Sequence, residues 1–289
     1  MEEVKCYVPE TLEEALRIRK ETGAIPLAGG TDLMVQHYSG TDLSPEFSKP
    51  IVIISNLEEL KGIRKREDGK IEIGALSTSA EIASSELVPY LVRAAASRMG
   101  AISLRNSATI GGNIGNASPK GDLPQPLILL DAEVVLKSLE GERSMLLDDF
   151  IKGAKKTELR DDEIITSILV EPRIFTYYMY HKIGTRRANA ISKLSISAVM
   201  DVDGDVITEF RAASGAAGPK VARSRDVENI LIGRRVSELP QLKEDFLNAY
   251  NNIISPHAMP GWRRNSTRRM LSYFLDKIVE GAKPGEIEA

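Results

Sequence analysis

The sequence has few of the residues that build disulfides or metal sites. It contains one cysteine, Cys6, and three widely separated histidines, His37, His181 and His257. A single thiol cannot form a disulfide within the chain or hold an iron–sulfur cluster. The spacing of the histidines argues against a zinc or non-haem iron site. We expect Cys6 to be a small buried residue beside an N-terminal strand, and we expect no metal site.

Long apolar runs and a strong charge imbalance are also missing. No stretch approaches the roughly eighteen apolar residues of a membrane span. The N-terminus, Met1–Lys5, lacks the apolar core of a secretory signal. The net charge of −3 gives no reason to expect nucleic acid as a partner. The arginines between 263 and 269 fit a solvated helix face or a subunit contact better. These absences predict a cytoplasmic protein without a membrane span.

The rest of the composition is that of a folded protein with more than one domain. Hydrophobic residues make up 42% of the 289 residues and charged residues 27%, as in ordinary globular chains. A change of character near residue 173 predicts a boundary. We expect one domain over 1–172, with subdomains of about 1–55 and 56–172, and a second over 173–289.

The first subdomain is predicted to be β-α-β. Thr11 and Glu14 form a capping pattern for a helix that ends at Gly23. Ile51–Ile54 is a short apolar run typical of a buried strand, and Ser39–Pro50 is expected to be a loop.

An α+β arrangement is predicted for the remainder. Strands are expected at 70–73, 133–137, 143–147 and 163–170, with a hairpin turn at Glu140-Gly141. Thr78 to Glu81 is a second capping box, and 91–99 is predicted to be helical. After residue 173 we expect strands at 175–183, 191–202 and 206–213. Helices at 224–233, 241–254 and 263–280 are expected to follow.

Two glycine pairs are the most informative features. Gly29-Gly30 follows an apolar run, and Gly111-Gly112 follows Thr109 about eighty residues later. Glycine has no Cβ and accepts positive φ, so the main chain can approach a phosphate closely. Either pair alone is more often a simple turn. Neither is a G-x-G-x-x-G or Walker sequence, so a Rossmann unit or a P-loop is not supported.

A series of motifs in fixed order accompanies the glycine pairs. They are Pro26–Leu33, Leu57–Ile63, Ile73–Ala75, Leu104–Ile114, Asp122, Leu130–Ala132 and Asp149-Phe150. This series resembles the FAD-binding medium subunit of the molybdenum hydroxylases, the xanthine dehydrogenase and carbon monoxide dehydrogenase group. The resemblance runs from about residue 3 to 172 and continues more weakly to the end. The segment from Ile254 to Arg263 looks closer to bacterial xanthine-dehydrogenase-type subunits.

The resemblance implies a fold and a role. The fold would be α+β: a two-part FAD-binding domain of the PCMH type, then a three-stranded antiparallel sheet with a helix bundle. The chain would be an oxidoreductase subunit that carries FAD in a heterotrimer. It would receive electrons from a molybdopterin-containing large subunit through a [2Fe–2S] small subunit and pass them to NAD, O2 or a quinone. The substrate of the complex would be an N-heterocycle or an aldehyde.

The resemblance also implies cofactor-binding residues, and no catalytic acid or base. The implied FAD contacts are Pro26, Leu27, Ala28, Gly29, Gly30, Thr31, Asp32, Leu33, Thr109, Ile110, Gly111, Gly112, Asn113, Asn116, Asp122 and Lys193. Asp122 would lie near a ribose, where a carboxylate can accept from two hydroxyls; a turn or helix cap before Pro124 explains it equally well. Lys193 would place a cation beside the flavin and favour its reduced form, unless it is an exposed strand lysine. The tyrosines from Tyr177 to Tyr180 either stack on the flavin or pack a core.

Two other classes of function remain open. A stand-alone flavin oxidoreductase of the same fold would need its own substrate pocket with an acid or a base, and none is identified. A flavin-free assembly subunit would have no need for glycines that permit close phosphate approach.

Overall fold

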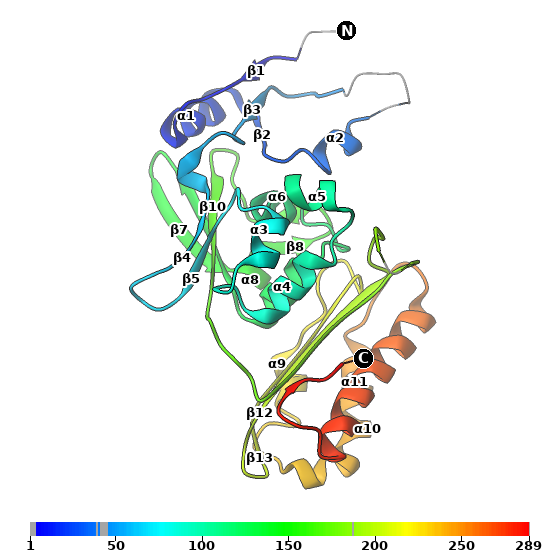
Figure 1. Ribbon diagram of the computed structural model, residues 1–289. Helices are drawn as coiled ribbons and strands as arrows, with labels where there is room; N and C mark the ends of the chain where they lie inside the picture. Colours follow the sequence, from blue (N-terminus) through cyan, green and yellow to red (C-terminus); the bar gives the residue numbers. More distant parts are fainter. Residues whose placement is uncertain (1–3, 39, 41–45, 187, 289) are drawn as a thin grey trace.

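The chain is arranged as three layers in a row. The computed structural model describes residues 4–38, 40, 46–186 and 188–288. Figure 1 shows an N-terminal layer at the top, a central layer of sheet and short helices, and a C-terminal sheet with two long helices below. Within the described residues, no helix combines the length and apolar character that crossing a bilayer requires.

The N-terminal layer is the predicted β-α-β arrangement with a parallel sheet. Its strands run in the order β1-β3-β2. Their bounds, with those of the helices, are β1 Cys6–Tyr7, α1 Leu12–Thr22, β2 Ile25–Leu27, α2 Leu33–Gln36 and β3 Ile51–Ile53. The Thr11 hydroxyl accepts from the Glu14 N–H, and Gly23 closes α1 at φ 64°, as the sequence predicts. The predicted loop from Ser39 to Pro50 falls partly outside the described residues.

The prediction that Cys6 is buried is wrong. Cys6 is exposed, because β1 has only two residues and lies at an edge of its sheet. The buried positions of this layer come from α1, β3 and the segment that follows it, including Leu16, Val52 and Leu57.

The central layer is built on a five-stranded antiparallel sheet in the order β4-β5-β10-β6-β7. The predicted hairpin is confirmed, because Ser138 pairs with Gly141 across Glu140. The strands are β4 Ile63–Lys65, β5 Ile71–Gly74, β6 Glu133–Ser138, β7 Gly141–Leu146, β8 Ile151–Gly153, β9 Lys156–Thr157 and β10 Ile164–Val170. The helices are η1 Glu58–Leu60, α3 Ser79–Ser84, α4 Tyr90–Ser97, α5 Ile102–Ser107, α6 Ile110–Gly115, α7 Pro124–Leu129 and α8 Leu147–Phe150.

Two local features of this layer bear on the sequence predictions. The Thr78–Glu81 capping box at the start of α3 is present with both of its hydrogen bonds. The second glycine pair lies inside a helix, because Gly111 and Gly112 belong to the first turn of α6. A turn in the ordinary sense is therefore not what these glycines form.

The C-terminal layer has an antiparallel sheet backed by two long helices. The three predicted strands are present, and a short fourth strand joins the edge of β11 in parallel. The elements are β11 Tyr177–Ile183, β12 Leu194–Asp203, β13 Val206–Gly215, α9 Arg225–Glu228, η2 Val236–Glu238, α10 Leu239–Asn252, α11 Pro260–Val279 and β14 Gly285–Glu286. The strand predicted from residue 191 begins at Leu194, and the helix predicted at 224–233 is only the four residues of α9.

The central strand β12 is buried on both faces. Val199 packs into the core of the central layer, with Tyr180 of β11 and Ala213 of β13. Ile196 and Ala198 belong instead to the core that α10 and α11 share with the sheet. A strand covered on both sides reads as a continuous apolar run, so its sequence does not reveal which side meets the central layer.

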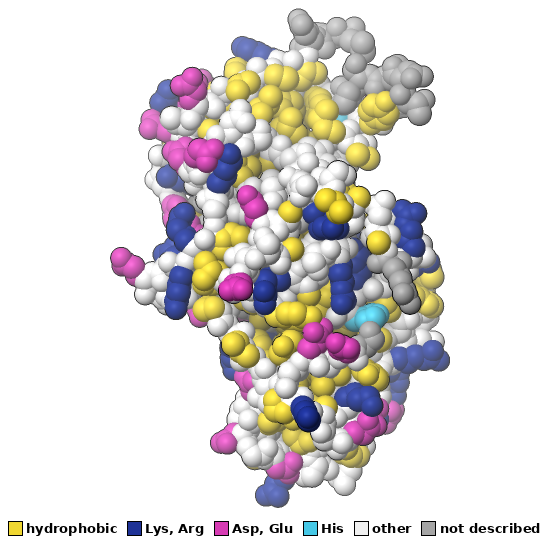
Figure 2. Space-filling view, in the orientation of Figure 1, with side chains coloured by type: hydrophobic (Ala, Val, Ile, Leu, Met, Phe, Trp, Pro, Cys, Tyr) yellow, Lys and Arg dark blue, Asp and Glu magenta, His cyan; other side chains and the backbone are white. Residues whose placement is uncertain are grey.

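The surface carries mixed charge. Figure 2 shows lysine, arginine and acidic side chains interspersed over one face. The arginine cluster of α11 is not simply a solvated face. Arg263 is buried, 9% exposed, and donates to the Ala216 carbonyl. Arg264 donates to the Ile254 carbonyl.

An aspartate surrounded by arginines joins the central and C-terminal layers. Asp131 lies 3.0 Å from Arg211, 2.6 Å from Arg223 and 2.8 Å from Arg225. Burial alone raises the pKa of Asp131, but the charges of the three arginines outweigh burial and hold the pKa below its ordinary value.

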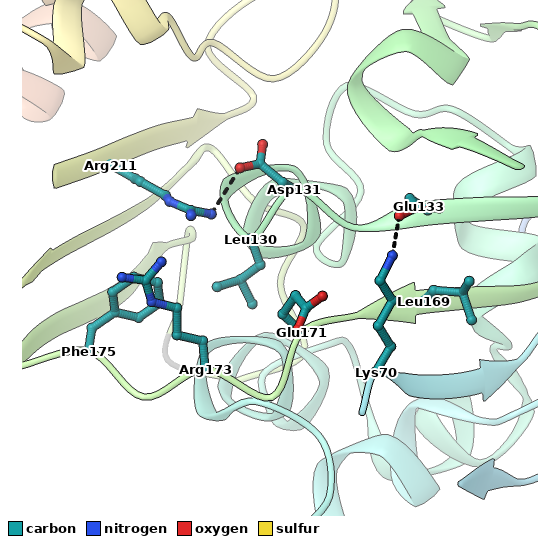
Figure 3. A pocket seen from close by; sticks show the side chains of 9 residues that line it. All are labelled: Lys70, Leu130, Asp131, Glu133, Leu169, Glu171, Arg173, Phe175 and Arg211. Carbon is teal, nitrogen blue, oxygen red and sulfur yellow. Dashed lines mark hydrogen bonds and ion pairs between the residues drawn. The ribbon is translucent and has the colours of Figure 1, made fainter. Parts of the chain in front are cut away.

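A cavity of about 240 Å³ lies at the same junction (Figure 3). Two ion pairs cross it, Asp131–Arg211 and Lys70–Glu133, the latter at 2.5 Å. Arg173 and Arg211 both lie over the ring of Phe175, at 4.8 and 5.7 Å from its centre. Since the Asp131–Arg211 pair joins the central and C-terminal layers here, we interpret the cavity as part of the contact between them.

The first prediction concerns Asp131→Asn. Asn accepts the left-handed backbone found at Asp131, φ 53°, so the variant tests the charge. Because the pKa of Asp131 is lower in the folded protein, its ionised carboxylate stabilises the fold at pH values above the unfolded-state pKa, about 3.9. That contribution is lost as the pH falls through the lower folded-state pKa. The variant should therefore melt at a lower temperature at neutral pH, with the difference shrinking below about pH 4. Thermal melts across this range measure it. A constant difference at all pH values would contradict the assignment to charge.

Candidate functional site

A cavity of about 450 Å³ lies between the N-terminal and central layers, within the 300–1,000 Å³ range of ligand sites. It brings together both glycine pairs. The predicted residues that line it are Pro26, Leu27, Ala28, Gly29, Gly30, Thr31, Asp32, Leu33, Thr109, Gly111, Gly112, Asn113 and Asn116. Segments about eighty residues apart in the sequence thus form one site.

The first glycine pair provides free backbone donors. A Cβ on Gly29 would lie 1.7 Å from the Ser107 carbonyl oxygen, so no side chain fits there. Gly30 has φ 68°, a conformation that favours glycine. Within the described part of the chain, the N–H groups of Gly29 to Asp32 donate to no protein acceptor. Unpaired donors of this kind are suited to an anion such as a diphosphate.

The second glycine pair provides close approach and an unpaired amide oxygen. A Cβ on Gly111 would lie 2.7 Å from the Ala75 Cβ. The Gly111 N–H donates to Ala75 and the Gly112 N–H to the Thr109 hydroxyl, so these donors are already used. The side-chain oxygen of Asn113 is buried and has no hydrogen-bond partner in the described structure. A ligand donor would satisfy it.

The walls of the cavity are mostly apolar, and sequence reasoning missed them. They come from β2, from β10 and the loop before it, and from the segments that follow β3, β5 and α5. The apolar members are Ile25, Ile54, Ala75, Leu76, Ala108, Leu159, Ile164 and Ile165. Arg19 also lines the cavity, and it donates to the carbonyls of Ala24, Arg160 and Glu163. Apolar walls around a few polar groups are typical of sites for ring-containing ligands.

A polar cluster closes one rim. Lys155, in the turn between β8 and β9, lies 3.0 Å from the Asp32 carboxylate and also donates to Asn116. Gln36 donates to both as well, at 2.9 Å to Asn116. Sequence reasoning missed Lys155 because no motif marks it and its partners lie 39 and 123 positions away.

Three of the predicted residues do not line the cavity. Ile110 is fully buried in the central core. Lys193 is half-buried in a bend one residue before β12. Asp122 lies under the C-terminal sheet, where its carboxylate is held by other side chains. Direct contact of these residues with a cofactor stays a prediction.

A buried ion pair holds Asp122. Lys182 of β11 lies 2.7 Å from one carboxylate oxygen, and the Ser192 hydroxyl donates to the other at 2.6 Å. The two charged side chains are 8% and 7% exposed. Burial raises the pKa of Asp122, opposed by Lys182 and Ser192. The neighbouring Tyr180 is buried, which raises its pKa well above the ordinary value, and its hydroxyl has no partner among the described groups. Lys182 is thus the lysine that pairs with Asp122, and Lys193 stays a predicted cofactor contact.

A second cavity of about 500 Å³ opens beside Lys182. It is lined by the end of β11 and the following loop, with Arg98, His181 and Arg186 among its residues. The cations outnumber acidic groups in this lining, which suits an anionic ligand.

The cavity that holds both glycine pairs, called the main cavity below, fits a dinucleotide such as FAD. Free N–H donors and the positive φ at Gly30 suit a diphosphate, and the apolar walls suit a flat ring. The unpaired Asn113 oxygen adds a hydrogen-bond acceptor for the ligand.

Comparisons with known proteins agree with this fit. A family model described as "FAD binding domain in molybdopterin dehydrogenase" matches residues 2–172, and "CO dehydrogenase flavoprotein C-terminal domain" matches 179–278. The nicotinate dehydrogenase FAD-subunit of Eubacterium barkeri is 34% identical over 246 residues, 81% of each chain. The glyceraldehyde dehydrogenase medium chain of Sulfolobus acidocaldarius is 31% identical, covering 93% of this chain and 96% of its own.

Solved structures share the fold. A chain of carbon monoxide dehydrogenase from Hydrogenophaga pseudoflava superposes with a TM-score of 0.85, at 23% identity. The superposition covers 94% of this chain and 96% of the other. The mixed α+β architecture of all three layers is therefore that of a known fold.

The second prediction concerns Gly29→Ala. The added Cβ must push the N-terminal layer away from Ser107, so we expect a loss of about 1–3 kcal/mol in the free energy of unfolding, as for an overpacked core. Chemical denaturation measures it. Gly261→Ala is the matched control, since no atom lies within 4 Å of its Cβ position. Equal effects at both glycines would contradict the steric argument.

The third prediction concerns the Asp122–Lys182 pair. Asp122→Asn or Lys182→Met alone leaves one buried charge unpaired, which costs about 3–5 kcal/mol of unfolding free energy. The double variant removes both charges and should lose clearly less than the sum of the single losses. Denaturation of all four proteins measures the coupling. Additive losses would show that the two charges do not stabilise one another.

Proposed function

The chain belongs to the FAD-binding medium subunits of the molybdenum hydroxylases, and on that premise we propose that it carries electrons through FAD held in the main cavity. As a flavoprotein subunit of this oxidoreductase family, it needs no acid–base machinery of its own. FAD supplies the redox chemistry, since it accepts single electrons and releases pairs; the protein supplies position, electrostatics and solvent access. The carrying observation is the single cavity formed by both glycine pairs.

The residues around the cavity have separate proposed roles. The free N–H groups of Gly29 to Asp32 would bind the diphosphate. The apolar walls at Ile25, Ile54 and Ile164 would hold a ring. Asn113, with its unpaired oxygen, would accept from a cofactor hydroxyl or amino group. The domain that we assign to 1–172 would thus bind FAD, since every residue that lines this cavity belongs to it.

The electrostatic role that the sequence suggested for Lys193 stays a prediction, and we propose Lys182 as a second candidate for it. Lys182 is nearly fully buried, and it pairs with Asp122. Salt screens a buried charge much less than an exposed one. Beside a flavin, a cation favours the reduced, more negative form, and the Asp122 carboxylate offsets part of the charge of Lys182. Asp122 keeps acceptor capacity beyond Lys182 and Ser192, because a carboxylate has about four lone-pair sites, so it could still accept from a ribose or ribityl hydroxyl.

The partners follow from membership of the family. The chain would receive electrons from [2Fe–2S] clusters on a small subunit, which takes them from a molybdopterin-containing large subunit. The acceptor would be NAD, O2 or a quinone. An anionic acceptor such as NAD is favoured by the basic second cavity beside Lys182. The substrate, an N-heterocycle or an aldehyde, would belong to the large subunit; two relatives are named for nicotinate and glyceraldehyde.

A stand-alone flavin oxidoreductase is the weaker alternative. The relatives are named as an FAD-subunit and a medium chain, which supports a part of a larger enzyme. Size-exclusion chromatography after co-expression with neighbouring genes separates the two readings. A complex of three different chains is expected, and a free monomer with its own dehydrogenase activity would contradict the proposal.

The fourth prediction is that the purified protein contains FAD. We expect the absorption bands of oxidised flavin, and heat treatment should release FAD, not FMN, on chromatography. Apoprotein should regain the spectrum when FAD is added. A protein that stays colourless with excess FAD would overturn the proposed function and leave a flavin-free assembly subunit as the better account.

A further inference from the structure

The backbone holds Lys155 in an unfavourable conformation. Lys155 has φ 58°, and its N–H donates to the carbonyl of Ala117 at 2.9 Å. Ala117 has φ 43°. Both residues therefore occupy the left-handed region, which costs energy for residues other than glycine, and such positions gather at ligand sites.

The strained turn brings the Lys155 ammonium to both halves of the cavity. Its Nζ lies 3.0 Å from the carboxylate of Asp32, which follows the first glycine pair, and it also donates to Asn116, which ends α6. Lys155 thus lines the same cavity as Gly29 to Asp32, whose N–H groups are free.

The ion pair with Asp32 does not account for this arrangement. The side chains of Lys155 and Asp32 are 46% and 53% exposed. An ion pair this exposed contributes little to stability, because water and salt screen it. The place of Lys155 in the cavity lining therefore calls for an explanation other than this ion pair.

The other cations of the cavity are less suited to an anion at the glycine pairs. Three cations line it, Arg19, Lys49 and Lys155. Arg19 is 8% exposed and donates to three backbone carbonyls. Lys49 is exposed and lies outside the glycine segments. Lys155 is the cation that contacts residues flanking both of them.

We propose that Lys155 is a binding residue for the diphosphate of FAD. The inference rests on the proposed function. When the cofactor binds, the ammonium exchanges the Asp32 carboxylate for a phosphate oxygen, a charge-assisted hydrogen bond that is stronger than neutral ones. Asp32 competes for the same cation, so its carboxylate opposes binding while its backbone N–H supports it.

The test compares variants that should change the affinity for FAD in opposite directions. Apoprotein is titrated with FAD, with ADP, which shares the diphosphate, and with riboflavin, which has no phosphate. Lys155→Gln should lower the affinity for FAD and for ADP at least tenfold and leave the affinity for riboflavin unchanged. The affinity of Lys155→Arg for FAD and ADP should stay within a few-fold of that of the unchanged protein. Asp32→Asn should bind FAD equally or more tightly. Lys156→Gln, an exposed lysine next to the site, is the matched control, and thermal melts verify that each variant folds.

Three outcomes would overturn the proposal, and they are distinguishable. If the unchanged protein binds FAD and Lys155→Gln binds it equally well, Lys155 is not a diphosphate residue, while the proposed function stands. If Lys155→Gln and Asp32→Asn both lower the affinity for FAD and for riboflavin by the same factor, the Lys155–Asp32 pair only holds the two layers together. If the unchanged protein binds no FAD, the proposed function itself fails, and this inference with it.

Discussion

The close packing of backbone against backbone at Gly29 is the constraint on which the site depends. The N-terminal layer meets the central layer where a Cβ would lie 1.7 Å from the Ser107 carbonyl. Within the central layer, a Cβ on Gly111 would lie 2.7 Å from the Cβ of Ala75. Both glycines line the cavity, and both allow chain segments to meet closely there. The pairs of glycines therefore matter first for how closely two chain segments meet, and the free N–H donors follow from that approach.

Sequence reasoning identified the parts of the site that carry a local signal. The glycine pairs, the Thr78 capping box and the Glu140-Gly141 hairpin each depend on residues close together in the chain, and all are present. The family resemblance placed these parts in one α+β flavoprotein fold. What the sequence could not show was the pairing of distant segments. Lys155 reaches Asp32 across 123 positions, and no local pattern encodes that contact.

The errors have physical causes as well. Cys6 was expected inside because cysteine is usually buried, but a two-residue edge strand exposes it. The strand predicted from residue 191 was placed too early because apolar residues surround Lys193 in the sequence. The strand begins one residue after Lys193, so Lys193 lies in a bend, and its contact with the cofactor stays a prediction. The order of apolar residues in β12 did not indicate which face meets the central layer, since both faces of the strand are buried.

The double burial of β12 has a consequence for how the molecule can be divided. Val199, Tyr180 and Ala213 complete the core of the central layer, although they belong to the sequence after residue 173. A fragment that ends at residue 172 would leave the apolar surfaces of α4 and α7 open to water. The two sides of the predicted boundary therefore share one apolar core. We expect the segment 1–172 to be less stable alone than with the sheet that follows it.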